Sequence, residues 1–277
     1  MKNIGIISLS NGIDPSKKSL IEKMIKKLEA NNIKVYSSKV LYSLENGLSK
    51  SPKLRANALM ELYKNPNIEG IFDISGGDLA NQVIPYINFE IIKNNPKSFF
   101  GYSDLSVILN SIYKKGGTKS FWFQLRHIIN DDNALKLIAN YLLNNDTSLL
   151  DFKYEFLQGS KMEGIVIGGN LRCSLKLAGT DYEMDFNNKI LFIESMGGDI
   201  NKISTYITQY KMMGAFEKVN GVILGTFIEL ENNYSKKEAL NLILDIIDNK
   251  NLPVIRTDEL GHKSNSKSIV IGKHYSF

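Results

Sequence analysis

The feature that most constrains the fold is an alternation of short apolar runs and amphipathic segments in the first half of the chain. Apolar runs at 3–9, 33–36, 68–74 and 99–100 are predicted strands, and segments with apolar residues at helical spacing follow them. This alternation is typical of a parallel sheet with helices on both faces, so we predict an α/β fold. In such sheets, ligands bind beyond the carboxyl ends of the strands.

In two of the expected helices, the spacing of the apolar residues predicts which side faces the core. The first follows the break at Gly12, Asp14 and Pro15, and the second spans 53–64. The residues predicted to point inward are Leu20, Ile21, Met24, Ile25 and Leu28 in the first helix, and Leu54, Ala58, Leu59 and Leu62 in the second. A helical turn at 79–84 and helices after Ser103 and at 131–144 complete the pattern.

A polar stretch at 144–148 interrupts this pattern and is the predicted domain boundary. Beyond it, apolar runs at 163–169, 189–193, 219–224 and 254–255 are predicted strands, with helices at about 200–212 and 236–248 between them. We therefore predict an N-terminal sheet domain at 1–148 and a smaller, mixed α/β C-terminal domain at 149–277.

The composition favours some partners and disfavours others. Lys and Arg number 34 against 29 Asp and Glu, a net charge of +5, but the lysines are scattered along the helices, so we expect solvated faces and no nucleic-acid partner. A single cysteine, Cys173, excludes an internal disulfide and a zinc–cysteine cluster, and without paired histidine ligands we expect no metal and no cofactor. The N-terminal apolar run is typical of a first strand rather than a signal peptide, so we expect a cytoplasmic protein without membrane association.

The turn at Ser103 is the first candidate for chemistry. An apolar run ends at Gly101, and a helical pattern begins at Leu105, so Ser103 is predicted at a strand-to-helix turn. Such a turn exposes a hydroxyl beside unpaired backbone N–H groups, as a nucleophile that attacks a carbonyl requires. The alternative is that Ser103 or Asp104 only caps the helix.

Four other positions have a functional and a structural interpretation. Gly76-Gly77 after a strand is either a tight turn or a loop that approaches a ligand, and it lacks the residues of a phosphate-binding motif. Glu194, at the end of an apolar strand, either faces a site or caps a helix. His262 is a surface loop residue or a base for a serine. Trp122 is a core residue or a ring that stacks on a ligand. Together, Ser103, Glu194 and His262 supply a nucleophile, a group that orients imidazole, and a base.

Five short motifs, in their order along the chain, carry a family resemblance. They are Gly76-Gly77 with Pro85-Tyr86-Ile87-Asn88 downstream, Gly101-Tyr102-Ser103-Asp104, Gly168-Gly169-Asn170-Leu171, Leu191-Phe192-Ile193-Glu194 and Gly261-His262. In this order they resemble the LD-carboxypeptidases, serine peptidases that include the microcin C self-immunity proteins. The resemblance extends from the first strand to Gly272.

The resemblance implies a Rossmann-like N-terminal domain and a smaller C-terminal domain with the site between them, in a homodimer. It implies that Ser103 is the nucleophile and that Glu194 and His262 complete a triad. It further implies oxyanion donors at the backbone N–H groups of Asp104 and of Gly77 or Asp78. The predicted substrate contacts are Gly76, Asn170 and Trp122.

The chain departs from the family pattern at three loops. Many relatives carry Arg-Gly-Gly-Tyr-Gly at the first loop, where this chain has Ser75-Gly76-Gly77-Asp78-Leu79, closer to the immunity-protein branch. Relatives have a Gly-Pro turn where this chain reads Phe121-Trp122-Phe123-Gln124, and further acidic residues where Ser195-Met196-Gly197-Gly198 follows Glu194. The walls of the pocket therefore differ more than the triad does.

These observations predict a serine carboxypeptidase that acts on a small peptide, with the L–D bond of murein tetrapeptides as the substrate that the resemblance implies. One alternative is hydrolysis of a peptidyl-nucleotide amide that confers self-immunity. Another is a ligand-binding homologue that has lost catalysis.

Overall fold

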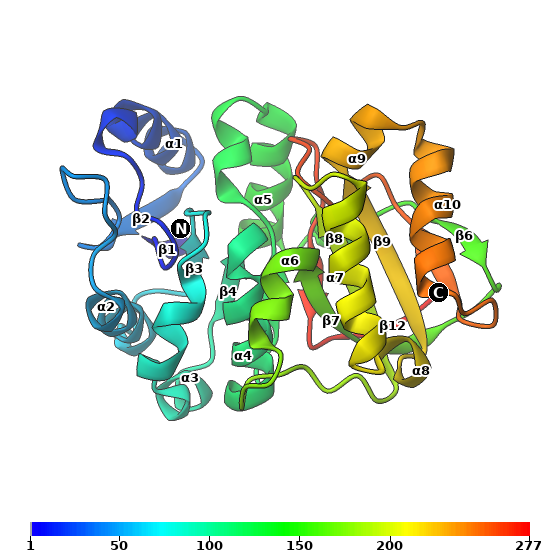
Figure 1. Ribbon diagram of the computed structural model, residues 1–277. Helices are drawn as coiled ribbons and strands as arrows, with labels where there is room; N and C mark the ends of the chain where they lie inside the picture. The colour runs from blue at the N-terminus through cyan, green and yellow to red at the C-terminus, as the bar shows by residue number, and fades with distance from the viewer. Residues whose placement is uncertain (1) are drawn as a thin grey trace.

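The computed structural model describes residues 2–277 and contains two six-stranded sheets that lie side by side (Figure 1). The first sheet has the spatial order β11 (Ile269–Ile271), β5 (Ser120–Trp122), β4 (Ser98–Gly101), β3 (Gly70–Asp73), β1 (Lys2–Ile7) and β2 (Ile33–Ser37). Its strands pair in parallel except for β11, which is antiparallel to β5. The predicted α/β fold with a parallel N-terminal sheet is confirmed.

Helices cover both faces of this sheet. They are α1 (Lys18–Ala30), α2 (Pro52–Lys64), α3 (Phe89–Asn94), α4 (Ser106–Gly116) and α5 (Asp132–Asn144), with short 3-10 helices η1 (Pro15–Lys17), η2 (Ala80–Tyr86), η3 (Ser103–Leu105), η4 (Leu125–Ile129) and η5 (Thr147–Leu150). In Figure 1, α1 and α5 lie above the first sheet, and α2 and α3 lie below it. Adjacent residues on one strand therefore reach different cores: Phe99 joins the cluster that includes α4, whereas Phe100 joins the one that includes α1 and α5.

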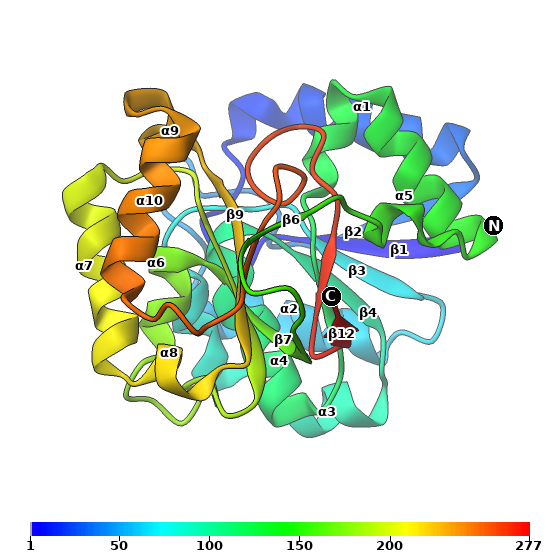
Figure 2. The same cartoon turned by 90° about the vertical axis from the view of Figure 1, so that its right-hand side faces the viewer.

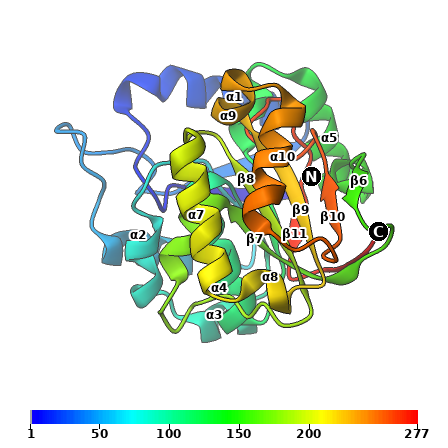
Figure 3. The same cartoon turned by 45° about the vertical axis from the view of Figure 1, so that its right-hand side comes forward.

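The second sheet has the order β12 (His274–Ser276), β7 (Glu163–Asn170), β8 (Lys189–Ser195), β9 (Gly221–Phe227), β10 (Val254–Arg256) and β6 (Glu155–Gln158). The four central strands are parallel, and both edge strands are antiparallel. Its helices are α6 (Leu171–Ser174), η6 (Leu175–Leu177), α7 (Ile200–Met212), α8 (Ala215–Lys218), α9 (Ile228–Asn233) and α10 (Lys236–Ile247). Figure 3 shows α7 and α10 side by side over this sheet.

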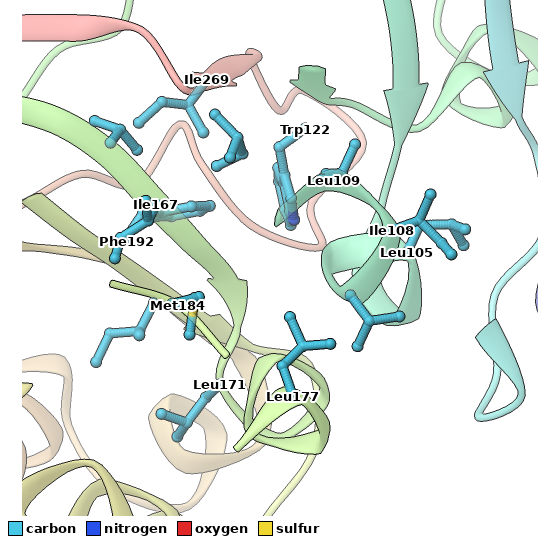
Figure 4. Packing of buried hydrophobic residues seen from close by; sticks show 14 of the residues in the cluster. Leu105, Ile108, Leu109, Trp122, Ile167, Leu171, Leu177, Met184, Phe192 and Ile269 are labelled. Atoms are coloured by element: carbon cyan, nitrogen blue, oxygen red, sulfur yellow. The ribbon is translucent and has the colours of Figure 1, made fainter. Parts of the chain in front are cut away.

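The chain crosses between the two sheets more than once. After β10 it returns to place β11 beside β5, and it then adds β12 to the edge of the second sheet. Figure 2 shows this C-terminal segment, in red, running between the sheets. One apolar cluster also spans both halves: Trp122 and Leu109 from the first pack near Ile167 and Phe192 from the second (Figure 4).

The prediction of an inward-facing side chain is wrong for two residues. Leu20 is 46% exposed and Leu54 is 48% exposed. In α1 the buried face consists of Ile21, Met24 and Leu28, and Leu20 lies at the edge of this face in the first turn of the helix. In α2 the residue after Leu54, Arg55, is buried instead, because its guanidinium donates to backbone carbonyls of the strand-end loops.

The strand order places the candidate site. Because β1 lies between β2 and β3, the chain runs to one side from β1 to β2 and to the other side from β2 to β3. This reversal opens a crevice at the carboxyl ends of β1 and β3. Asn11, after β1, forms an isolated bridge with Gly76, after β3. The next strand, β4, ends immediately before the Ser103 turn.

Candidate active site

Ser103 lies at the predicted strand-to-helix turn. Tyr102 is extended, and Ser103 has a φ of +54°, a left-handed conformation that is uncommon for a residue with a side chain. Neither η3 nor α4 has a side-chain cap, so the interpretation of Ser103 or Asp104 as a helix cap is wrong. The turn is instead held from the helix, since the hydroxyl of Ser106 donates to the carbonyl of Ser103 at 2.7 Å.

Glu194 and His262 are joined directly. Nδ1 of His262 lies 2.6 Å from Oε2 of Glu194, whose side chain is fully buried at the end of β8. The side-chain amide of Asn170, at the end of β7, donates to the other carboxylate oxygen of Glu194 at 2.9 Å. A carboxylate only accepts hydrogen bonds, so Nδ1 carries the hydrogen of the neutral imidazole, and Nε2 is left as a proton acceptor.

Ser103 and His262 line the same cavity, which has a volume of about 390 Å³. Its remaining lining residues come from the segment after β1 that includes η1, from the loop after β3, from the end of β4, from η4 and from the loop after Glu194. They are Asn11, Gly12, Ile13, Asp14, Lys17, Ser75, Gly76, Gly77, Tyr102, Arg126 and Met196. Gly76, Gly77 and Ser103 therefore face one cavity. Glu194 lies behind His262, outside the lining.

The backbone N–H groups predicted to bind the oxyanion differ in whether they already donate a hydrogen bond within the protein. In residues 2–277, no protein group accepts a hydrogen bond from the N–H of Gly77 or of Asp104. The N–H of Asp78, in contrast, donates to Oδ1 of Asn11 at 3.1 Å. Gly77 has a φ of +125°, and a Cβ there would lie 2.3 Å from the Asn11 side chain, so the loop requires glycine.

Two aromatic rings hold the histidine. Tyr102 packs on His262 with ring centroids 4.5 Å apart, and its hydroxyl donates to the carbonyl of Gly261 at 2.8 Å. Trp122 is fully buried, and its ring meets His262 edge-on at 6.3 Å. Trp122 is therefore a core residue behind the site and does not line either cavity beside Ser103.

A buried polar network supports the loops from below. The carboxylate of Asp73 accepts hydrogen bonds from the N–H of Leu9, at 2.6 Å, and from the N–H and hydroxyl of Ser75. The carboxylate of Asp104 accepts from the hydroxyl of Ser10 and the N–H of Ala80.

Two groups of this region have shifted pKa values. Burial outweighs these hydrogen bonds and raises the pKa of Asp73 to about 6. Burial, together with the charge of Arg126, lowers the pKa of His127 to about 4, so this histidine is neutral at pH 7.

Sequence reasoning missed several residues of this site. Asn11, Lys176 and Arg126 stand in segments without a recognisable motif, and Tyr102 was noted only as part of one. The pairing of Asn170 with Glu194 could have been suspected, because both end neighbouring apolar strands. In the described part of the chain there is no group of three or more His, Cys, Asp or Glu side chains that could hold a metal ion, and no helix is both long and apolar enough to cross a membrane.

Comparisons with known proteins match nearly the whole chain. The family model of the LD-carboxypeptidase N-terminal domain matches residues 4–122, and that of the C-terminal domain matches residues 163–277. The chain is 26% identical over 303 residues to the microcin C7 self-immunity protein MccF of Escherichia coli, covering 97% of this chain and 88% of that protein. It is 26% identical over 285 residues to a probable murein peptide carboxypeptidase of Bacillus subtilis, covering 97% and 86%.

Solved structures show the same architecture over nearly the whole chain. MccF in its wild-type apo state superposes with a TM-score of 0.85 at 25% identity, covering 99% of this chain and 92% of that one. An MccF-like protein from Streptococcus pneumoniae, solved with AMP, has a TM-score of 0.83 at 22% identity and shares the fold. The two family models together match most of the sequence, and the chain belongs to the LD-carboxypeptidase family.

Proposed function

We propose that this protein is a serine carboxypeptidase in which Ser103, His262 and Glu194 form a catalytic triad. The observation that carries the proposal is the oriented histidine: its Nδ1 is fixed on a buried carboxylate, and the ring faces the cavity that Ser103 also lines. The free Nε2 is then available as a general base. The left-handed conformation of Ser103 resembles the strained turn on which other hydrolases present a nucleophile.

The chemistry follows from these groups. The Oγ of Ser103 attacks the carbonyl carbon of the amide while Nε2 of His262 takes the hydroxyl proton, and Glu194 stabilises the imidazolium that forms. The carbon–nitrogen bond then breaks, and the proton on Nε2 passes to the leaving amine. Water attacks the remaining acyl-enzyme ester, gives its proton to Nε2, and releases the acid as Ser103 recovers its hydrogen.

The unpaired backbone donors suit the charge that develops in this reaction. The tetrahedral oxyanion would accept from the N–H groups of Asp104, beside the nucleophile, and Gly77, across the cavity. Loss of one such donor costs about 100- to 1,000-fold in kcat in other hydrolases. Asp78 would join them only if its hydrogen bond to Asn11 were released.

For the substrate, we favour the L–D bond before the C-terminal D-Ala of a murein tetrapeptide. The support is the relative named as a probable murein peptide carboxypeptidase, which this chain matches over 97% of its length. The cavity of about 390 Å³ is large enough for one small amino acid and its carboxylate.

A second candidate is hydrolysis of a peptidyl-nucleotide amide, as in the self-immunity relative. It is supported by a second cavity of about 640 Å³ at Ser103, which holds the aromatic ring of Tyr206 and the cations of Arg172 and Lys202. Trp122, the only tryptophan, is buried and is not available to stack on a base.

Turnover of a murein tetrapeptide that ends in D-Ala tests the proposal. Release of D-Ala, followed by mass spectrometry, is expected for the wild type and not for Ser103→Ala or His262→Ala. Unchanged release by folded Ser103→Ala would overturn the triad. If the folded wild type releases nothing from the tetrapeptide and cleaves a peptidyl-nucleotide amide, the second candidate replaces the first. If it cleaves neither, is not labelled at Ser103 by a fluorophosphonate and still binds one of the two compounds, the chain is a binding protein.

A further inference from the structure

Arg126 contributes a cation to the cavity without an ion-pair partner. It lies on η4, immediately after the strand β5 that precedes the site, and its side chain lines the same cavity as Ser103 and His262. Its Nε has no exposed surface and no hydrogen-bond partner. No carboxylate of residues 2–277 lies within ion-pairing distance of its guanidinium.

The acidic groups around Arg126 are engaged elsewhere. Asp73 is the carboxylate with the largest electrostatic effect on Arg126, but both its oxygens already accept hydrogen bonds from Leu9 and Ser75. Asp14 also lines the cavity, where its carboxylate caps η1 by accepting from the N–H of Ser16. Tyr102 donates its hydroxyl to Gly261.

A half-buried cation without a partner is destabilising, and a ligand that supplies the opposite charge removes this cost. Burial lowers the pKa of Arg126, yet a guanidinium stays protonated at neutral pH. Its planar donors match a carboxylate, which can accept two parallel hydrogen bonds. Gly76 lies beside this guanidinium: a Cβ at that position would lie 3.8 Å from Nη2 of Arg126, in van der Waals contact, and glycine leaves that space free.

Ser103, together with Met196, lines two cavities. The cavity with Arg126 has a volume of about 390 Å³, and the cavity with Asn170 and Lys202 has a volume of about 640 Å³. A scissile carbonyl at Ser103 would therefore place one side of the substrate in each. The smaller cavity suits a single leaving residue, and the larger one suits the rest of the peptide.

We propose that Arg126 binds the free C-terminal carboxylate of the leaving residue and so makes the protein selective for cleavage at a C-terminus. This inference rests on the proposed function, because it assigns the leaving side of the same site. Arg126 follows Phe121-Trp122-Phe123-Gln124, the segment in which this chain departs from the family pattern.

The test compares two substrates that differ only at the carboxylate. One is a murein tetrapeptide ending in D-Ala, and the other is the same peptide ending in D-alaninamide. We expect the wild type to prefer the free acid by about 10- to 100-fold in kcat/KM, the range for a hydrogen-bonded charge. Arg126→Met should lose this preference through a higher KM for the acid, with the amide little affected, and Arg126→Lys should retain part of it.

The matched control is Lys237→Met, which removes an exposed cation on α10, on the other sheet. It should keep the full preference. Labelling of Ser103 by a fluorophosphonate, together with the melting temperature, checks that Arg126→Met is folded and has an intact nucleophile. If that variant is labelled and still prefers the free acid as the wild type does, the assignment of Arg126 is wrong while the triad stands.

Direct binding separates this proposal from the proposed function. Wild-type protein should bind D-alanine more tightly than D-alaninamide, and Arg126→Met should not discriminate between them, whether or not the peptide is hydrolysed. Absence of hydrolysis with this binding pattern intact would overturn the reaction and leave the carboxylate site. If AMP or inorganic phosphate binds through Arg126 and D-alanine does not, the site is one for phosphate, and the proposal fails.

Discussion

Ser103 has a backbone conformation that is energetically unfavourable for any residue with a side chain. Its φ of +54° places a side chain in the left-handed region, at about 1–2 kcal/mol for most L-residues. No side-chain hydrogen bond repays this by capping a helix. At this residue, therefore, the structure favours placement of the hydroxyl over stability, as is common at functional sites.

Two substitutions of Ser103 distinguish its role in catalysis from the conformational strain of its backbone. Ser103→Ala and Ser103→Gly should both abolish hydrolysis, but only glycine relieves the strain. In an ordinary helix or strand, glycine is about 0.5–1 kcal/mol less stable than alanine. Here we expect Ser103→Gly to be at least as stable as Ser103→Ala in urea-induced unfolding. A glycine variant about 1 kcal/mol less stable than the alanine variant would contradict the strained turn.

Asp73 gives a second prediction at this scale, on pH. Burial raises its folded-state pKa to about 6, above the ordinary value of 3.8, so the folded protein binds more protons than the unfolded chain between these values. The contribution of Asp73 to the free energy of unfolding is fully present below about pH 4 and is lost as the pH rises through about 6. The loss is on the order of 3 kcal/mol.

Over the same pH range, the effect of His127 on stability has the opposite sign to that of Asp73. Its folded-state pKa of about 4 lies below the ordinary 6.5, so its contribution is lost as the pH falls. The wild-type pH profile can therefore be flat, and the comparison must be made with Asp73→Asn. The free energy of unfolding of this variant, minus that of the wild type, should increase between pH 4 and 7. A constant difference would show that Asp73 keeps an ordinary pKa.

At the scale of elements, the site is assembled from the ends of neighbouring parallel strands. In the second sheet, β7 ends at Asn170 and β8 continues past Glu194, and these two residues are paired in register. Asn170 then serves both elements: its amide donates to Glu194, and its Oδ1 accepts from the N–H of Cys173 at the start of α6. The carboxylate that orients His262 is thus positioned by the strand beside it.

Variants of Asn170 test this double role. Asn170→Ala removes a hydrogen bond to a buried charge and a helix cap, so it should destabilise the fold by about 3 kcal/mol and lower kcat. Asn170→Asp keeps the cap and loses only the donor, and it places a like charge beside Glu194. Its stability should recover as the pH falls, because protonation removes the repulsion. If Asn170→Asp has wild-type kcat at neutral pH, Asn170 does not position Glu194.

At the scale of the whole molecule, the two halves share a core and meet at the nucleophile. Lys176, on η6 of the second half, lies 2.6 Å from a carboxylate oxygen of the fully buried Asp104 and also donates to the carbonyl of Asp78. This one side chain therefore connects the turn of Ser103, the Gly-Gly loop and the second half. The return of β11 to the first sheet is a second connection.

The Lys176–Asp104 pair should be strongly coupled. Lys176→Met leaves a buried carboxylate without its cation and should cost about 2 kcal/mol or more in the free energy of unfolding. Combining it with Asp104→Asn should cost less than the two single changes together, which a double-mutant cycle measures. Arg172→Met removes an exposed partner of Asp78 from the same cluster and should cost less than about 1 kcal/mol. Additive effects of Lys176 and Asp104 would exclude the coupling.

The sequence by itself determined the layered α/β fold, the turn at Ser103 and the glycine loop, because each depends on local periodicity or on one residue's backbone preference. Only the tertiary structure decided that Trp122 is core, that Asn170 holds Glu194, that Arg126 faces the cavity, and that β11 returns to the first sheet. These features depend on which strand ends become neighbours, and strand order follows from long-range packing that no local pattern encodes. The burial of Leu20 and Leu54 was predicted wrongly for the same reason, because the sheet against which a helix packs decides which of its faces is buried.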